Sequence, residues 1–115
     1  MREIVLDTET SWLDPSQGHR LVEIGAVEIV NQIATGVVFH ALINPEREVP
    51  EEAFRVHGHS TASLADKPVF AAVVDEFLAF IGEDRLVIHN AEFDMRFLNA
   101  ELATLSYTAG SGSGS

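Results

Sequence analysis

Short apolar runs broken by polar turns mark the first half of the chain. Residues 4–6, Ile-Val-Leu, predict a short strand that is buried on both of its faces. Two longer runs rich in β-branched residues, 21–30 and 33–43, are separated only by Asn31 and Gln32. A two-residue connection between such runs predicts a tight hairpin, in which Asn31 tolerates a positive φ better than Gln32 does.

Three later segments carry helical signals. Residues 50–58 predict a short helix, with a proline and acids in the first turn and a glycine past the end. Residues 68–82 predict a clearer helix, and a short apolar run at 85–89 predicts a second buried strand, after which Asn90 is placed to cap the last helix. The apolar positions expected to face the core of these two longer helices are Val69, Phe70, Val73, Val74, Phe77, Leu78, Ile81, Phe93, Phe97 and Leu98.

The predicted order is three strands, two helices, one strand and one helix, which is an α/β fold with a mixed sheet. A right-handed crossover would place the strand at 85–89 parallel to the strand at 4–6. Ligands of such sheets bind at the carboxyl ends of adjacent parallel strands. Asp7 and Glu9 follow the strand at 4–6 at that edge of the sheet. Residues 89–94 follow the strand at 85–89 at the same edge.

Asp7, Glu9 and Asp94 are candidate metal ligands. Asp7 and Glu9 stand two residues apart, so in an extended backbone they share one face. Each has a simpler interpretation, since strand-end acids can point into water and Asp94 suits the first turn of a helix. Three carboxylates brought together by the topology, with no Lys or Arg in either motif, instead predict a divalent cation site.

Composition limits the partners. The 115 residues carry a net charge of −11, from 18 acidic and 7 basic residues, so bulk electrostatics cannot hold a polyanion. Nucleic-acid chemistry would have to run through bound cations. The absence of cysteine excludes disulfides and fits a reducing compartment, so we expect a cytoplasmic location. With no membrane-length apolar run and no leader, we expect one domain over 1–105, followed by a Gly/Ser-rich linker or tag over 106–115.

Together, five motifs resemble those of the DEDD group of 3′–5′ exonucleases, and in particular the proofreading (epsilon) subunit family of bacterial DNA polymerase III. The motifs are Asp-Thr-Glu-Thr at 7–10, Leu-Asp-Pro at 13–15, Glu-Ile-Gly-Ala at 23–26, Phe-Arg-Val-His-Gly at 54–58 and His-Asn-Ala-Glu-Phe-Asp at 89–94. The resemblance covers about residues 2–104 and implies a ribonuclease H-like fold.

The resemblance also implies a function, which is two-metal hydrolysis of the terminal phosphodiester at the 3′ end of single-stranded DNA. Asp7, Glu9 and Asp94 would be catalytic and would hold Mg²⁺ or Mn²⁺. The residues implied to bind substrate are Thr8, Thr10, His57, Gly58 and Asn90.

The sequence departs from the family in its C-terminal part. The family continues beyond this point with a His and a fourth metal-binding Asp, so we expect the C-terminal part of the fold to be missing and the activity to be weak or lost. This truncation, the Gly-Ser tail and two altered loops lead us to expect an engineered chain.

The altered loops suggest further hypotheses. Trp12 either folds back over the core or presents itself to a partner. An engineered protein or ligand partner would use a surface made of Ser11, Trp12, His59, Ser60, Thr61 and Ser63. A third hypothesis is a new hydrolytic site that pairs Ser11 or Ser60 with His57 or His59. A fourth is an inactive truncated domain that self-associates through exposed apolar surface.

Overall fold

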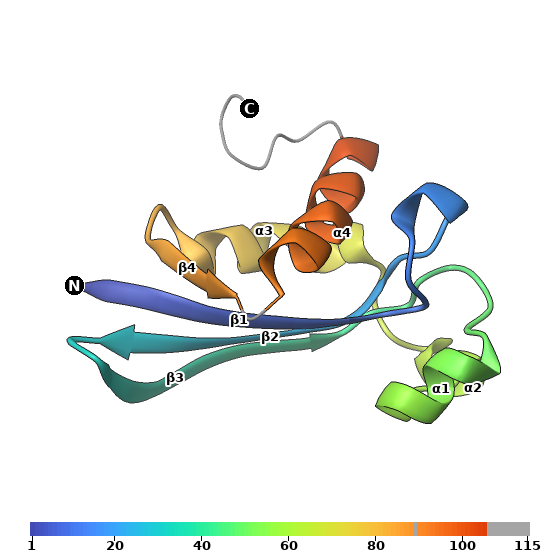
Figure 1. The fold of residues 1–115 in the computed structure, drawn as a ribbon, viewed down its shortest axis with the longest axis horizontal. Helices are drawn as coiled ribbons and strands as arrows, with labels where there is room; N and C mark the ends of the chain where they lie inside the picture. The colour runs from blue at the N-terminus through green and yellow to red at the C-terminus, as the bar shows by residue number, and fades with distance from the viewer. Residues whose placement is uncertain (89, 106–115) are drawn as a thin grey trace.

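The computed structural model of the protein describes residues 1–88 and 90–105 (Figure 1). The predicted linker at 106–115 and His89 lie outside the described residues. The elements are β1 Arg2–Thr10, a 3₁₀ turn Pro15–Gln17, β2 Leu21–Val30, β3 Ile33–Leu42, α1 Glu51–His57, α2 Thr61–Leu64, α3 Phe70–Ile81, β4 Arg85–Ile88 and α4 Ala91–Thr104. In the described part of the chain, no helix is long and apolar enough to cross a membrane.

The four strands form one mixed sheet in the order β3-β2-β1-β4. β1 pairs antiparallel with β2 and parallel with β4, and β2 pairs antiparallel with β3. The predicted parallel placement of the two short apolar strands is therefore confirmed. The carboxyl ends of β1 and β4 meet at one edge, where Leu6 is paired with Ile88.

The predicted hairpin between β2 and β3 is confirmed. Asn31 has φ 52° and Gln32 has φ 70°, so both turn residues adopt the left-handed conformation that matches the twist of the flanking strands. The start of the chain fastens this turn, because the Asn31 amide donates to the Met1 carbonyl at 3.1 Å and the Asn31 side chain accepts from the Met1 ammonium group at 2.7 Å.

Helices α3 and α4 cover one face of the sheet (Figure 1). Ile4 and Leu6 point into this layer and are buried, whereas Val5 between them is 40% exposed. The prediction that residues 4–6 are buried on both faces is wrong, because the helices lie on one side only. The buried members of the core are Ile4, Leu6, Leu21, Ile24, Ala26, Phe39, Ile43, Phe70, Val74, Phe77, Phe97, Leu98 and Leu102.

The face that these helices leave open carries a row of valines. Register aligns Val87, Val5, Val27 and Val38 across all four strands. Val5, Val38 and Val87 are 40% exposed or more. This row is the kind of exposed apolar surface through which we expect an isolated domain to self-associate, and self-association stays a prediction.

The predicted helices form close to their expected positions. α1 ends at His57 and is capped by Gly58, which has a φ of 78° in the left-handed region that favours glycine. α3 begins at Phe70, with Val69 as its N-cap, and buries Phe70, Val74 and Phe77. Asn90 takes the N-cap position of α4, but its side chain makes no capping hydrogen bond.

Candidate active site at the carboxyl ends of β1 and β4

The two faces of β1 separate the predicted site residues. Asp7 is exposed and Glu9 is half-buried, whereas Thr8 between them is buried with Thr10 on the helix-covered side. The Thr8 hydroxyl donates a hydrogen bond to Asp94 Oδ1. Asp94 is only 4% exposed in the first turn of α4, so this bond holds its carboxylate on the helix side of the sheet.

Negative charge accumulates around Glu9. Partial burial and the neighbouring charges of Asp7 and Glu23 raise the pKa of Glu9, and the charge of Asp94 acts in the same direction. His59 opposes the shift. A cation bound at this edge would relieve the repulsion, and carboxylate oxygens are the ligands that Mg²⁺ and Mn²⁺ prefer. The donor chemistry and the charge therefore fit a divalent cation.

The carboxylates of Asp7, Glu9 and Asp94 do not converge on a single point in the structure. Within residues 1–88 and 90–105, no three His, Asp or Glu side chains are close enough together to hold one metal ion. The predicted three-carboxylate centre of Asp7, Glu9 and Asp94 is not assembled in this arrangement. Asp7 and Glu9 alternate with Thr8 along β1, and Thr8 holds Asp94, so the three carboxylates do not converge on one point. The charge of Asp94 nevertheless raises the pKa of Glu9, so a cation bound at this edge would have to draw together carboxylates that are already neighbours.

Glu23 forms a polar cluster with two histidines beside Glu9. In the β1–β2 register Glu23 is the direct partner of Glu9. Its carboxylate accepts from His40 Nε2 at 2.5 Å and from His59 Nε2 at 2.7 Å. Partial burial acts to raise the pKa of Glu23, but these two hydrogen bonds outweigh burial and lower the pKa. Glu23 consequently stays ionised and adds to the negative charge at the strand ends.

The hydrogen bonds of His57 define its tautomer. Nε2 donates to the Thr10 carbonyl at 3.0 Å, and Nδ1 accepts from the His59 amide at 3.0 Å. The ring stacks on that of His59 with centroids 5.2 Å apart. Burial first, and then the charge of His59, lower the pKa of His57, so it is held as the neutral imidazole. Next to it, Gly58 has open space around the Cα, so only its positive φ requires glycine.

Ser11 and Trp12 do not form the predicted contact surface. Ser11 is fully buried; its hydroxyl accepts from the Arg20 amide at 2.9 Å and lies 3.0 Å from His19 Nδ1. Trp12 is half-buried and packs on a second small apolar cluster that includes Val22. Trp12 therefore folds back over apolar side chains, as one of its two interpretations expected, and a role of its exposed part in binding a partner stays a prediction.

The segment predicted as a recognition loop, 59–63, contains the start of α2 instead. Ser60 is the N-cap, and the Ser60 and Ser63 hydroxyls each accept the other's backbone amide at 3.0 Å. The Thr61 hydroxyl accepts from the Val49 amide at 2.8 Å. These side chains fix local structure, and neither Ser11 nor Ser60 meets His57 or His59 as the hydrolytic hypothesis required.

One ion pair near this end of the molecule had not been predicted. Glu101 of α4 is 2% exposed and accepts from Arg20 Nη2 at 2.5 Å and from the Leu21 amide at 3.0 Å. The sequence signal was available, because Glu101 stands four and three residues after Phe97 and Leu98 on the apolar face of the helix. A charged residue at such a position requires a buried partner.

Comparison with known proteins gives consistent matches. Residues 4–109 match the family described as Exonuclease. The epsilon subunit of DNA polymerase III from Rickettsia conorii (strain ATCC VR-613 / Malish 7) is 58% identical over 108 residues, which is 94% of this chain and 47% of the relative. The same subunit from Escherichia coli (strain K12) is 49% identical over 90% of this chain and 44% of the relative. The chain therefore spans less than half the length of these relatives, and the comparisons give no support to an engineered origin.

Solved structures agree on the fold. A structure titled as exonuclease X in complex with 5′ overhanging duplex DNA superimposes with a TM-score of 0.70 and 32% identity, over 83% of this chain and 52% of that one. A product-bound exonuclease I structure superimposes with a TM-score of 0.80 over 93% of this chain and 26% of that one. At 16% identity, the second similarity concerns the fold alone. The mixed sheet with helices is the ribonuclease H-like fold that the motifs implied.

Proposed function

The chain belongs to the exonuclease family, and from this premise we propose that it hydrolyses single-stranded DNA from the 3′ end. The observation that carries the proposal is the concentration of carboxylates around Glu9, at the edge where β1 and β4 end. Support also comes from its relationship to the epsilon subunit of DNA polymerase III, and from structural neighbours that are exonucleases in complex with DNA.

We propose Asp7, Glu9 and Asp94 as the residues that hold Mg²⁺ or Mn²⁺. When bound, a divalent cation of this kind supplies Lewis-acid stabilisation of the phosphate and lowers the pKa of a coordinated water. The protein contributes oxygen ligands and their orientation. Thr8 acts through its hydrogen bond to Asp94 and is a positioning residue.

We place the terminal nucleotide beside His57 and Gly58. The neutral His57 ring donates a hydrogen bond to the Thr10 carbonyl and so holds the end of α1 against the end of β1. This contact fixes the position of the His57 side of the site. Thr10 itself is fixed by donating its hydroxyl proton to the Trp12 carbonyl at 2.6 Å. Asn90 lies exposed at the start of α4, within the motif that ends at Asp94.

We expect turnover to be slow. The chain spans 47% of the Rickettsia relative, and the family resemblance implies a general-base His and a fourth Asp in the part that is not covered. General-base assistance contributes about 10²–10⁴-fold in rate. We therefore expect residues 1–115, assayed by themselves, to turn over more slowly by at least roughly this factor than the same residues together with those two groups.

The test is digestion of a 5′-labelled single-stranded oligonucleotide with Mn²⁺ at high protein concentration. We expect a ladder that shortens from the 3′ end, that requires the cation, and that disappears in Asp7→Ala. Asp66→Ala removes an exposed acid that follows α2 and pairs with Lys67, and it should leave the ladder intact. An oligonucleotide that stays whole, or a ladder that persists in Asp7→Ala, would refute the assignment.

A further inference from the structure

The free edge of the sheet at β3 presents unpaired backbone groups. β3 is the outermost strand on its side, next to β2. The Ile43 amide donates to the Val22 carbonyl at 2.8 Å, which fixes the alternation of the antiparallel ladder. By that alternation, the amide and carbonyl groups of Val38, His40 and Leu42 point away from β2, toward the outside of the sheet.

The chain itself begins to cover this edge and then stops. The Asn44 amide donates to the Pro68 carbonyl at 2.8 Å, and Asn44 forms an isolated parallel bridge with Val69. The segment before α3 thus pairs with one residue past the end of β3 and turns into the helix. This pairing uses the outward-facing groups of Asn44 and stops short of His40 and Leu42, which have no strand on their outer side among residues 1–88 and 90–105.

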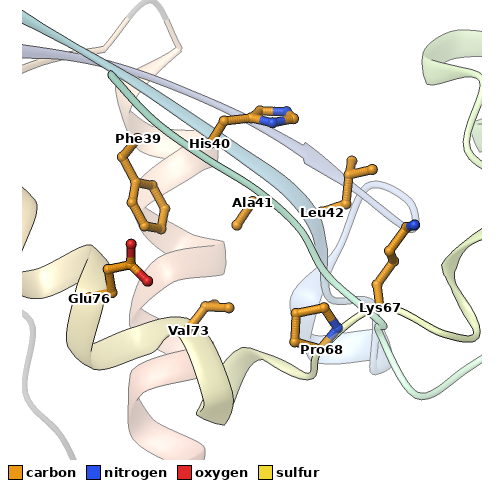
Figure 2. Close-up of a pocket in the computed structure, with 8 residues that line it drawn as sticks. All are labelled: Phe39, His40, Ala41, Leu42, Lys67, Pro68, Val73 and Glu76. Atoms are coloured by element: carbon orange, nitrogen blue, oxygen red, sulfur yellow. The ribbon is translucent and has the colours of Figure 1, made fainter. Parts of the chain in front are cut away.

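A cavity lies directly beside the open part of the edge. It has a volume of about 370 Å³ and lies between β3 and α3 (Figure 2). Phe39 and Ala41 point toward α3 in this view, and Val73 rises from the helix to meet them. An extended peptide paired with β3 would direct every second side chain into this space. The lining favours an apolar side chain there.

The charges near the cavity indicate which kind of partner would bind there. Glu76 of α3 lines the cavity, is exposed, and takes part in no ion pair among the described residues. The chain carries a net charge of −11, and β3 contains no Lys or Arg. Lys67 also lines the cavity, but it pairs with Asp66 at 3.6 Å, which leaves Glu76 as the lining charge without an ion pair among the described residues. A second copy paired through its own β3 would bring net repulsion and no Lys or Arg on the added strand. A basic segment of another protein satisfies both conditions.

We propose that the edge of β3 and the adjoining cavity bind an extended, basic segment of a partner protein. The segment adds to the sheet as a further strand along Val38, His40 and Leu42. It places an apolar side chain over Phe39 and Val73, and a Lys or Arg beside Glu76. The outer backbone edge of β3 and the cavity beside α3 contain none of the proposed metal ligands, although the His40 side chain also bonds Glu23. The proposal therefore does not depend on nuclease activity.

The test uses the fluorescein-labelled peptide Ser-Val-Thr-Leu-Thr-Lys-Thr, whose alternate residues are apolar or basic on one face. We expect saturable binding by fluorescence anisotropy and protection of the His40 and Leu42 amides from hydrogen exchange. Glu76→Lys should weaken binding roughly tenfold, and a peptide with Glu in place of Lys should recover the loss. Glu52→Lys makes the same charge change on α1 and should leave binding unchanged, and Glu76→Lys should leave the nuclease assay unchanged.

Three results would overturn the proposal. The first is the absence of saturable binding. The second is binding that survives both Glu76→Lys and N-methylation of the peptide amides that face β3, since this would be general attraction to an acidic protein. The third is protection of the His40 and Leu42 amides without peptide in a concentration-dependent dimer, which would make a second copy the occupant.

Discussion

At the residue scale, the buried carboxylate of Glu101 fastens α4 to the start of β2. It accepts both from the guanidinium of Arg20 and from the Leu21 amide, so it satisfies a charge and a buried backbone group at once. Arg20 also reaches Glu46 at 3.4 Å, but the Glu46 side chain is 56% exposed. One arginine therefore has a buried partner and an exposed partner whose contributions can be compared.

We expect Glu101→Ala to lower the free energy of unfolding by about 2–4 kcal/mol, because it leaves the Leu21 amide and part of the Arg20 charge without a partner. Glu46→Ala should cost less than about 1 kcal/mol, since exposed ion pairs are screened by solvent. Urea denaturation of the two variants measures both. Equal losses would mean that burial does not decide the value of the Arg20 pairs.

His57 makes stability depend on pH. Its pKa in the folded protein lies below its ordinary value, so the unfolded chain takes up the proton first as the pH falls. The stabilisation is complete above about pH 6.5 and is lost as the pH falls from there through the folded-state pKa. Burial, followed by the charge of Arg47, also lowers the pKa of His19, which adds a second contribution of the same sign.

We therefore expect the free energy of unfolding to fall between pH 7 and pH 5, and to fall less in His57→Gln. Glutamine can still accept and donate hydrogen bonds but does not titrate in this range. Chemical denaturation at several pH values measures the slope, and His19→Gln combined with His57→Gln should flatten it further. A slope that is unchanged in His57→Gln would show that the histidine is protonated without cost.

At the scale of elements, local rules account for most of what the sequence predicted. The hairpin, α1 and α3 follow from apolar periodicity and turn residues, which act between neighbours along the chain. The parallel pair of β1 and β4 follows from the handedness of the crossover between them. The predictions that proved wrong or undecided concern which face of an element is buried. Val5 is exposed because α3 and α4 cover only the other face of the sheet, and this depends on segments distant in the sequence. For the same reason, the sequence could not decide between the two interpretations of Trp12.

The site was predicted less completely than the fold for the same reason. Motif spacing identified Asp7, Glu9 and Asp94. The position of the Asp94 carboxylate, however, depends on its hydrogen bond with Thr8, which lies 86 positions away in the sequence. Arg20 and Glu101 pair across 81 positions of sequence, so no local pattern could join them. α2 is only four residues long, and its capping serines are also typical of loops.

The turn of the β2–β3 hairpin gives a prediction at this scale. Gln32 holds a φ of 70°, which a residue with a side chain adopts at a cost, whereas glycine adopts it freely. Gln32→Gly should raise the free energy of unfolding by about 0.5–1 kcal/mol. Asn31→Gly should not, because it removes the side-chain contact with the Met1 ammonium group. Thermal or urea denaturation compares the two, and a destabilised Gln32→Gly would contradict the argument.

At the scale of the whole molecule, the distribution of charge links stability to the proposed function. The net charge of −11 opposes a compact state, and part of it is concentrated where β1 ends. Any salt screens the general repulsion. Only an ion that binds the native carboxylates also gains from the arrangement of Asp7 and Glu9. These two effects can be separated without measuring catalysis.

We expect millimolar Mn²⁺ to raise the midpoint of thermal unfolding more than NaCl at equal ionic strength. A ligand at 100 times its Kd adds about 2.7 kcal/mol when it binds only the native state.

Asp7→Asn should act in two opposite directions. Without metal it should stabilise the protein, because the charge of Asp7 repels that of Glu9. With Mn²⁺ it should lose the additional stabilisation, because a ligand is gone. Asp66→Asn removes a charge elsewhere and should keep the Mn²⁺ effect. If Mn²⁺ and NaCl act alike in the unaltered protein, the carboxylates around Glu9 repel one another without forming a metal site, and the nuclease proposal loses its cation.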